Sequence, residues 1–207
     1  MLKKIARTIL GILLVYGAVA FALKAGIGVL PVDAAITSIA TLIGMKVGTF
    51  SMLFHGSFFL GQIAMERRDF KKTEFLQMLY ITLGGSVLNF FLYTVLKDVT
   101  FSFYPLRVLV CIMAFAVASF GCIMVMETHL MRTPMEGCIQ MIADRIGTTM
   151  GKLRQKIDVV LVIISVAISL VFGVEWALRE GTIIAMVIFG PMLDFWKTYV
   201  FSRNKNK

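Results

Sequence analysis

Ionisable and amide side chains are rare within the long apolar segments of this sequence, and the few that occur are candidates for chemistry. His55, Asn89, Asp158 and Asp194 stand inside such segments. A charge in the hydrocarbon region of a membrane costs at least ~2.5–3.5 kcal/mol, so such residues usually face a bundle interior or water. We therefore treat His55, Asn89 and Asp194 as candidates for a solute or ion pathway. The simpler alternative is a hydrogen bond between helices for each, and for Asp158 the neutralisation of Lys156 or Arg154.

No arrangement of residues typical of catalysis can be found. The chain has no HExxH, GxSxG or P-loop sequence and no cysteine–histidine pair in a suitable context. The three cysteines, Cys111, Cys122 and Cys138, lack the spacing of metal ligands and are expected to be small buried hydrophobic residues. We predict that the protein is not an enzyme and has neither a cofactor nor a metal site.

Two short acidic phrases stand out between the apolar segments. Residues 31–48 and 134–151 align without a gap at a separation of 103 residues, with seven identities and Asp33 opposite Glu136. A polar stripe at helical spacing follows in each copy. The stripe consists of Asp33, Thr37 and Thr41 in the first copy and of Glu136, Gln140 and Asp144 in the second.

A second pair of phrases indicates that the whole chain is duplicated. The segment from Gly85 to Phe91 resembles that from Gly190 to Trp196 and places Asn89 opposite Asp194. Each copy then reads as one span, a short helix and two more spans. Because a unit of three spans inverts its second copy, the pattern favours a transporter architecture with inverted repeats, about 1–100 and 101–207. Under the first separation His55 falls opposite Asp158, so a His–Asp pair is conceivable.

Both acidic phrases have the features of short helices. Pro31 and Pro134 fit a first helical position, and Thr133 with Glu136 three residues later predicts a capping box. The glycines suit helix ends or close approach, namely Gly44, Gly48, Gly147 and Gly151. A helix of about 14 residues rises only ~21 Å, too little to cross, so each is re-entrant or interfacial. Capping alone would explain the proline and the acid, whereas a polar stripe on a dipping helix would line a cavity.

The composition requires a membrane. Of 207 residues, 58% are hydrophobic and 16% charged, which leaves too few polar groups to cover a soluble surface. We predict an all-α membrane protein with one transmembrane domain, 1–207, and an uncleaved first helix. The six expected spans are approximately Thr8–Leu30, Thr49–Ala64, Glu74–Leu96, Leu106–Glu127, Ile157–Trp176 and Thr182–Val200.

The charge pattern gives an orientation. The formal charge of +9 comes from short basic clusters between apolar runs, which is typical of cytoplasmic loops and argues against nucleic acid as a partner. Sixteen of the 21 Lys and Arg residues fall on one side of an alternating six-span arrangement. The bias places both termini in the cytoplasm.

Two further phrases resemble those of a known family. The sequence from Gly28 to Gly48, with Pro31, Asp33 and Gly44, is similar to the G-x-x-P-x-D…G-x-x-x-G phrase of the YczE/YyaS/YitT group of small multi-pass membrane proteins. Gly181, Thr182, Gly190 and Pro191 match its G-T…G-P phrase. The soluble C-terminal domain of the YitT branch is absent, so the YczE-like branch is closer. The resemblance implies a bacterial inner-membrane protein without a settled substrate.

Two functions remain open at this point. The first is a small secondary transporter or channel-like protein for a small solute or ion, with the polar helix stripes lining its path. The second is a membrane subunit that transports nothing and regulates a partner protein. Besides the lipid bilayer, the expected partners are a small solute or ion and either a second copy of the chain or another membrane protein.

Overall fold

Every regular element of secondary structure in the described residues is a helix. The computed structural model describes residues 2–67, 70, 72–131 and 133–198. A 3₁₀ turn, η2 (Lys72–Leu76), precedes α4, and a π-helix, η3 (Phe91–Val95), extends it. The eight α-helices are α1 (Leu2–Ala25), α2 (Pro31–Leu42), α3 (Val47–Glu66), α4 (Gln77–Phe90), α5 (Tyr104–Met126), α6 (Pro134–Ile146), α7 (Met150–Phe172) and α8 (Glu180–Trp196).

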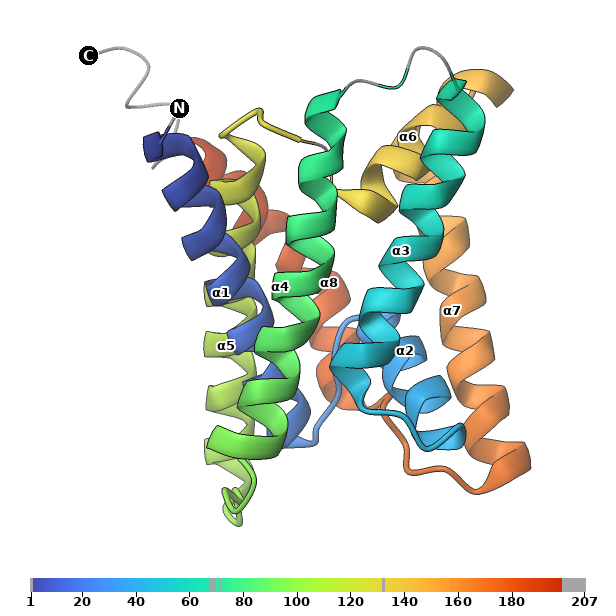
Figure 1. Cartoon of the computed structure of the whole chain (residues 1–207). Helices are drawn as coiled ribbons and strands as arrows, with labels where there is room; N and C mark the ends of the chain where they lie inside the picture. Colours follow the sequence, from blue (N-terminus) through green and yellow to red (C-terminus); the bar gives the residue numbers. More distant parts are fainter. Residues whose placement is uncertain (1, 68–69, 71, 132, 199–207) are drawn as a thin grey trace.

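Six long helices run side by side, and the two short ones lie at opposite ends of the bundle (Figure 1). The helix α6 lies at the end where α1 begins, and α2 lies at the other. We call these the α6 end and the α2 end. The two acidic phrases of the sequence therefore form separate helices on opposite faces of the molecule.

The helices form two groups. In the first, α1 packs on α5 and α4, and α8 packs on α5. The second group consists of α3, which packs on α4 and α6, and α7, which packs on α2. Over the described residues, α7 and α8 make at most marginal contact with each other. Ile12, Ile36 and Ile139 are almost fully buried in one apolar cluster, which joins the two short helices to α1.

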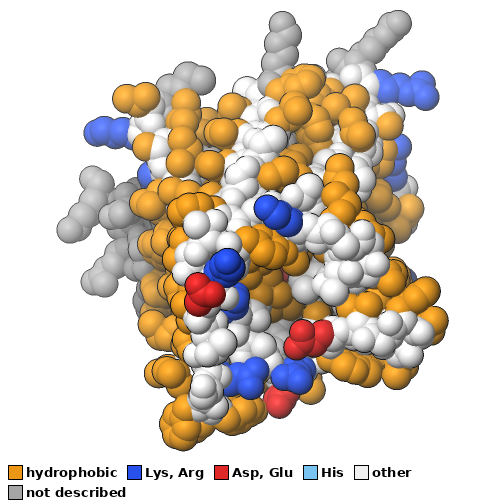
Figure 2. Space-filling model, turned by 60° about the horizontal axis from the view of Figure 1, so that its bottom comes forward, with side chains coloured by type: hydrophobic (Ala, Val, Ile, Leu, Met, Phe, Trp, Pro, Cys, Tyr) orange, Lys and Arg blue, Asp and Glu red, His pale blue; other side chains and the backbone are white. Residues whose placement is uncertain are grey.

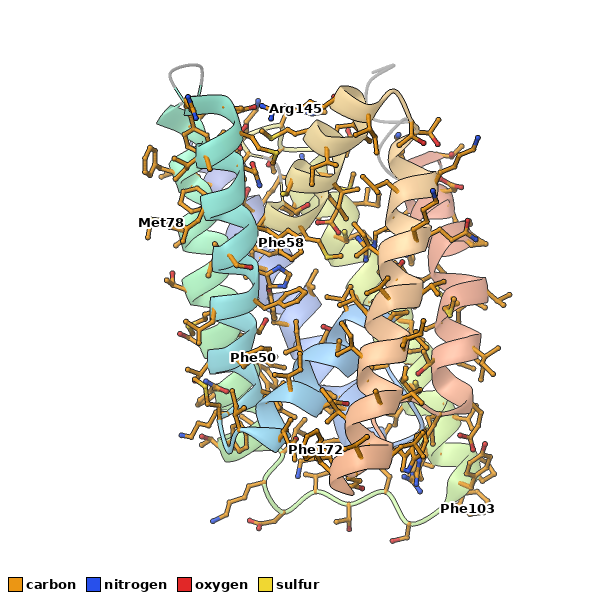
Figure 3. All side chains as sticks on the ribbon, turned by 90° about the vertical axis from the view of Figure 1, so that its right-hand side faces the viewer. Phe50, Phe58, Met78, Phe103, Arg145 and Phe172 are labelled. Atoms are coloured by element: carbon orange, nitrogen blue, oxygen red, sulfur yellow. The ribbon has the colours of Figure 1, made fainter. Side chains whose placement is uncertain are left out.

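The outer surface is that of a membrane protein. Large apolar side chains are exposed on α4, α5, α7 and α8, among them Met78, Leu109, Ile163 and Ile183. Figure 3 shows Met78 and Phe103 pointing away from the bundle, whereas Phe50 and Phe58 of α3 point into it. Such a surface is stable only against hydrocarbon or another apolar partner.

Four helices are long and apolar enough to cross a membrane, or five if α2 and α3 form one broken span. Between α2 and α3 the chain bends by 118°. The prediction of six spans is therefore only partly supported. The helix α8 is 17 residues long, short of the ~20 that a crossing helix needs, and α3 qualifies only together with α2. The last expected span also reaches residues 199–200, which lie outside the described ranges.

Candidate functional site

Proline starts each short helix and glycine follows its end. Pro31 and Pro134 are the first residues of α2 and α6. Gly44 and Gly147 have φ of 67° and 68°, a left-handed conformation that costs glycine little. The amide of Gly44 donates to the Thr41 carbonyl at 3.2 Å, which satisfies one of the free carbonyls at the end of α2. Local chemistry thus accounts for the length of both helices.

The start of α6 differs from the predicted capping box. Thr133 is the N-cap by its backbone conformation, but its side chain accepts no hydrogen bond from the helix backbone. Instead, its hydroxyl donates to the carboxylate of Glu136. The expectation was wrong in this respect because the Thr133 hydroxyl acts as a donor, and the Glu136 carboxylate pairs with a charged partner on α7.

That partner is Arg154, which bridges two carboxylates. Its Nη1 lies 2.7 Å from Oε1 of Glu136, and its Nε donates to Oδ1 of Asp158 at 3.0 Å. Burial alone would raise the pKa of Glu136, but the guanidinium and the Thr133 hydroxyl hold that pKa below its usual value. Asp158 is therefore neutralised by Arg154, the alternative that the sequence left open.

His55 does not replace Arg154 as the partner of Asp158. Its Nδ1 is buried and has no hydrogen-bond partner among the described residues. Its ring makes edge contacts with Phe54 and Tyr80, with ring centres 5.6 and 6.3 Å away. A buried polar atom without a partner is uncommon and calls for a physical explanation.

A pocket of about 420 Å³ opens at the α6 end. Two residues of the second polar stripe, Glu136 and Gln140, contribute to its wall, and Glu74 and His129 add further polar groups. The Gln140 amide also donates to Asp144 at 2.7 Å, so these stripe residues interact along α6. The lining consists of Thr73, Glu74, Met126, His129, Leu130, Met131, Thr133, Glu136, Gly137 and Gln140.

A smaller pocket of about 140 Å³ opens at the α2 end. Thr37 and Thr41 of the first stripe line it, and the Oγ1 atom of Thr37 is buried without a described partner. Figure 2 shows this end of the molecule, where acidic and basic side chains gather on an otherwise largely apolar surface. The lining consists of Ala22, Leu23, Gly26, Gly28, Val29, Thr37, Thr41, Glu175, Trp176 and Ala177.

Asp33 is half-buried and lines neither pocket. It borders a void of only about 10 Å³ against apolar residues of α1 and α5, such as Ala18 and Phe115. It lies within electrostatic reach of Arg154 and Glu136. The two acids of the repeated phrase thus occupy different environments, since Glu136 reaches a pocket and a guanidinium and Asp33 reaches neither directly.

Asn89 holds two helices together. Its Oδ1 accepts from the Gly48 amide at 2.9 Å, and its amide donates to the Thr49 hydroxyl at 2.9 Å. Tyr93 accepts from the Val47 amide at 3.1 Å, so two side chains of the following helix cap the start of α3. Asp194, the residue opposite Asn89 in the repeat, is exposed on α8. Neither residue lines one of the two pockets.

Glycines allow the close contact that Asn89 seals. A Cβ atom on Gly48 would lie 2.1 Å from the Gly85 carbonyl oxygen, and one on Gly85 would lie 2.4 Å from that of Gly48. The backbones of α3 and α4 therefore touch. Gly151, the counterpart of Gly48 in the repeat, is the second residue of α7.

Two arginines, Arg107 and Arg179, tie the α2 end together. Arg107 donates to the carbonyls of Ala25 and Gly26 at 2.6 and 2.9 Å, and Arg179 donates to that of Gly26 at 2.7 Å. The start of α8 packs against the same loop, since the Gly181 amide donates to the Ile27 carbonyl at 2.7 Å. Free carbonyls at the end of α1 were the signal that could have predicted these contacts.

No group of three or more potential metal ligands lies together in the part of the chain that the structure describes. The three cysteines are free thiols, and Cys111 and Cys138 are buried.

Comparison with known proteins gives one match. The model of a family of unknown function, DUF6198, matches residues 2–198. No curated protein matches the chain. No solved structure matches it either.

Proposed function

The chain belongs to DUF6198, a family of unknown function, and from that premise we propose that it is a small secondary transporter for a small solute or ion. Its two halves would be inverted copies, and its path would run from the pocket at the α6 end to the pocket at the α2 end. In proteins of this design the site lies where the two halves meet.

The observation that carries the proposal is that the two pockets match. At the separation of 103 residues found in the sequence, six lining positions of one pocket coincide with six of the other. Unrelated surface hollows would have no reason to share positions on three different segments. The matched pairs are Leu23 with Met126, Gly26 with His129, Gly28 with Met131, Thr37 with Gln140, Trp176 with Thr73, and Ala177 with Glu74.

The packing of the helices supports the same relation, except that the contact of α3 with α4 is scarcely repeated between α7 and α8. The contact of α1 with α4 has its counterpart in that of α5 with α8. Likewise α2 with α7 corresponds to α6 with α3, and α2 with α3 corresponds to α6 with α7. In this arrangement α1, α3, α4, α5, α7 and α8 are the six spans, and α2 and α6 dip in from opposite faces.

The region between the pockets favours a transporter over a channel. Ile36 and Ile139 belong to one buried apolar cluster, and Ser38 hydrogen-bonds Ser165 across α2 and α7 at 2.8 Å. This packing closes the direct path between the pockets. A solute would therefore pass only when α2 or α6 moves, which is the motion of alternating access.

We assign the α6 end to the cytoplasm of a bacterial inner membrane. The basis is the bias of Lys and Arg towards that side and the resemblance to the YczE-like group. That narrower family name and this location are part of the proposal.

A reconstitution experiment tests the transport. Purified protein in liposomes is assayed for flux of a broad panel of small solutes and ions. Gln140→Trp and Thr41→Trp would each fill one pocket and should reduce flux at least about tenfold, because each ring obstructs one end of the path. Thr82→Trp adds the same bulk at an exposed position of α4 and should leave the flux unchanged.

The proposal fails if no member of the panel crosses in wild-type liposomes, or if the two pocket variants transport as well as Thr82→Trp. A single partner that co-purifies in fixed ratio would then favour a regulatory membrane subunit.

A further inference from the structure

The interior contains two sets of residues at matching positions with different chemistry. In the second half, Glu136, Arg154 and Asp158 form the ion-paired set. At the separation of 103 residues, their counterparts are Asp33, Ser51 and His55. A serine thus stands in the first half where the second half has a guanidinium.

The two sets belong to one electrostatic region. Both Asp33 and His55 lie within electrostatic reach of Arg154 and Glu136. The region holds three carboxylates, Asp33, Glu136 and Asp158, against the one guanidinium of Arg154 among the described residues. Arg154 already binds the other two directly, so Asp33 has no ion pair among the described residues, and a charge without one is costly away from water.

His55 lacks a partner in the same set. Its Nδ1 is buried without a hydrogen bond, although a buried imidazole normally has one. It follows Ser51 by one helical turn, as Asp158 follows Arg154. The first half therefore has a carboxylate and an imidazole at the positions where the second half has two carboxylates.

The packing around Ser51 favours a small occupant. Ser51 is 2% exposed, and its side chain interacts with the hydroxyl of Tyr16, which also meets Tyr80. A bound organic cation would need space that these side chains fill. A proton needs none.

We propose that Asp33 and His55 form a site that binds one exchangeable proton. This proton neutralises charge in the first half, as the Arg154 guanidinium neutralises Glu136 and Asp158 in the second. The proton comes from water in a pocket, binds a carboxylate oxygen of Asp33 or Nδ1 of His55, and returns to water. Thr37, one turn after Asp33, connects the site to the α2 pocket through its buried and unpartnered hydroxyl.

The site deepens the transport function proposed above and rests on it for the coupling of proton and solute. The titration itself depends on the groups that face the site from each neighbouring helix. Tyr16 of α1, Tyr80 of α4, Glu136 of α6 and Arg154 of α7 interact with Asp33 or His55, and Cys122 of α5 and Asp158 of α7 interact with Glu136 and Arg154.

Infrared titration of the purified full-length protein in detergent tests the site. Between about pH 5 and pH 8 the wild type should show the C=O stretch of a protonated carboxyl group, and isotope-labelled aspartate should shift it. Asp33→Asn should abolish this band because it removes the carboxyl group with little change of shape. Asp194→Asn removes a carboxyl group from the exposed face of α8 and should leave the band intact.

Ser51→Arg provides the converse test. A fixed guanidinium beside Asp33 should abolish the band while Asp33 is still present, since it keeps the carboxylate ionised. If that variant does not fold, His55→Gln should shift the midpoint of the band, because an amide neither binds nor releases the proton.

A band that persists in Asp33→Asn, or a wild type without any aspartate band over this range, would overturn the site. The titration needs no transported solute. If the Asp33 band is present but no solute crosses, the proton site stands and the transport function is rejected. If solute crosses but the band is absent, the transport function stands and the proton site is rejected.

Discussion

The starts of α3 and α7 are the same phrase of the repeat, yet they are held in different ways. Asn89 and Tyr93 of the next helix segment cap α3, and its backbone touches α4 at Gly85. The helix α7 relies on its own N-cap, since the Thr149 hydroxyl accepts from the Lys152 amide at 3.4 Å. A Cβ atom on Gly190, the counterpart of Gly85, would have nothing within 4 Å.

The two halves therefore differ in the kind of interaction that joins their helices. Hydrogen bonds and direct backbone contact join α3 to α4, whereas α7 is joined to α6 by the charges around Arg154 and is scarcely joined to α8. Neutral packing is insensitive to pH and salt, while a partly exposed ion pair is not. We expect the contact between α3 and α4 to be the stiffer of the two, and the ion pair between α6 and α7 to be the one that salt and acid weaken.

The largest effect should come from filling the backbone contact of the first half. Gly85→Ala would place a methyl group against the Gly48 carbonyl, and we expect it to lower the free energy of unfolding by about 2–3 kcal/mol. Gly190→Ala should change it by less than about 1 kcal/mol, because the gain in helix propensity there is opposed by the clash with Pro191. Denaturant unfolding in detergent measures both. Equal losses in the two variants would mean that the halves pack alike.

An intermediate effect should follow from removing the charge that joins α6 to α7. Arg154→Gln leaves Glu136 and Asp158 without their partner, and since these side chains are partly exposed we expect a loss of about 1–2 kcal/mol at neutral pH. Lys156→Gln removes a charge from an exposed position of the same helix and should have little effect.

The same pair of variants gives a pH dependence. Because the pKa of Glu136 is lowered in the folded protein, its stabilisation is present above the unfolded pKa of about 4.5 and is lost as the pH falls through the folded value. Lowering the pH from neutral to acid should therefore lower the midpoint of thermal unfolding of the wild type and of Lys156→Gln. The midpoint of Arg154→Gln should fall much less. A parallel acid response in all three would contradict the role of the ion pair.

The smallest effect should come from the cap on α3. Asn89→Ala removes the acceptor for the Gly48 amide and the donor to Thr49, which we expect to cost about 1 kcal/mol. Asp194→Ala, its counterpart, should stay within about 0.5 kcal/mol because the side chain is exposed. If Asp194→Ala proved the more harmful, the residue would have a role that its exposure does not suggest.

The sequence predicts more of the architecture than of the contacts. The repeated prolines and glycines determine where α2 and α6 begin and end, because proline at a first position and a left-handed glycine are local effects. The polar stripes likewise indicate residues that line the two pockets. The sequence could not predict which partner each polar residue binds. Asn89, Arg107 and Arg179 each bind a segment more than 40 residues away along the chain.

The residues at which the spans begin and end were also poorly predicted from the sequence. The helix α7 begins at Met150, whereas hydropathy placed the span from Ile157. The helix simply continues through Lys152, Arg154 and Lys156, because basic side chains at a membrane surface can extend along the helix into water. Arg154, the residue on which the ion-paired set depends, lies in this stretch.

The contact between Arg179 and the Gly26 carbonyl joins residues 153 positions apart, and it lies beside the pocket at the α2 end. During synthesis, the end of the first helix must therefore wait for almost the whole chain before this bond can form. Until the last helix has been inserted, that side of the molecule stays unfinished.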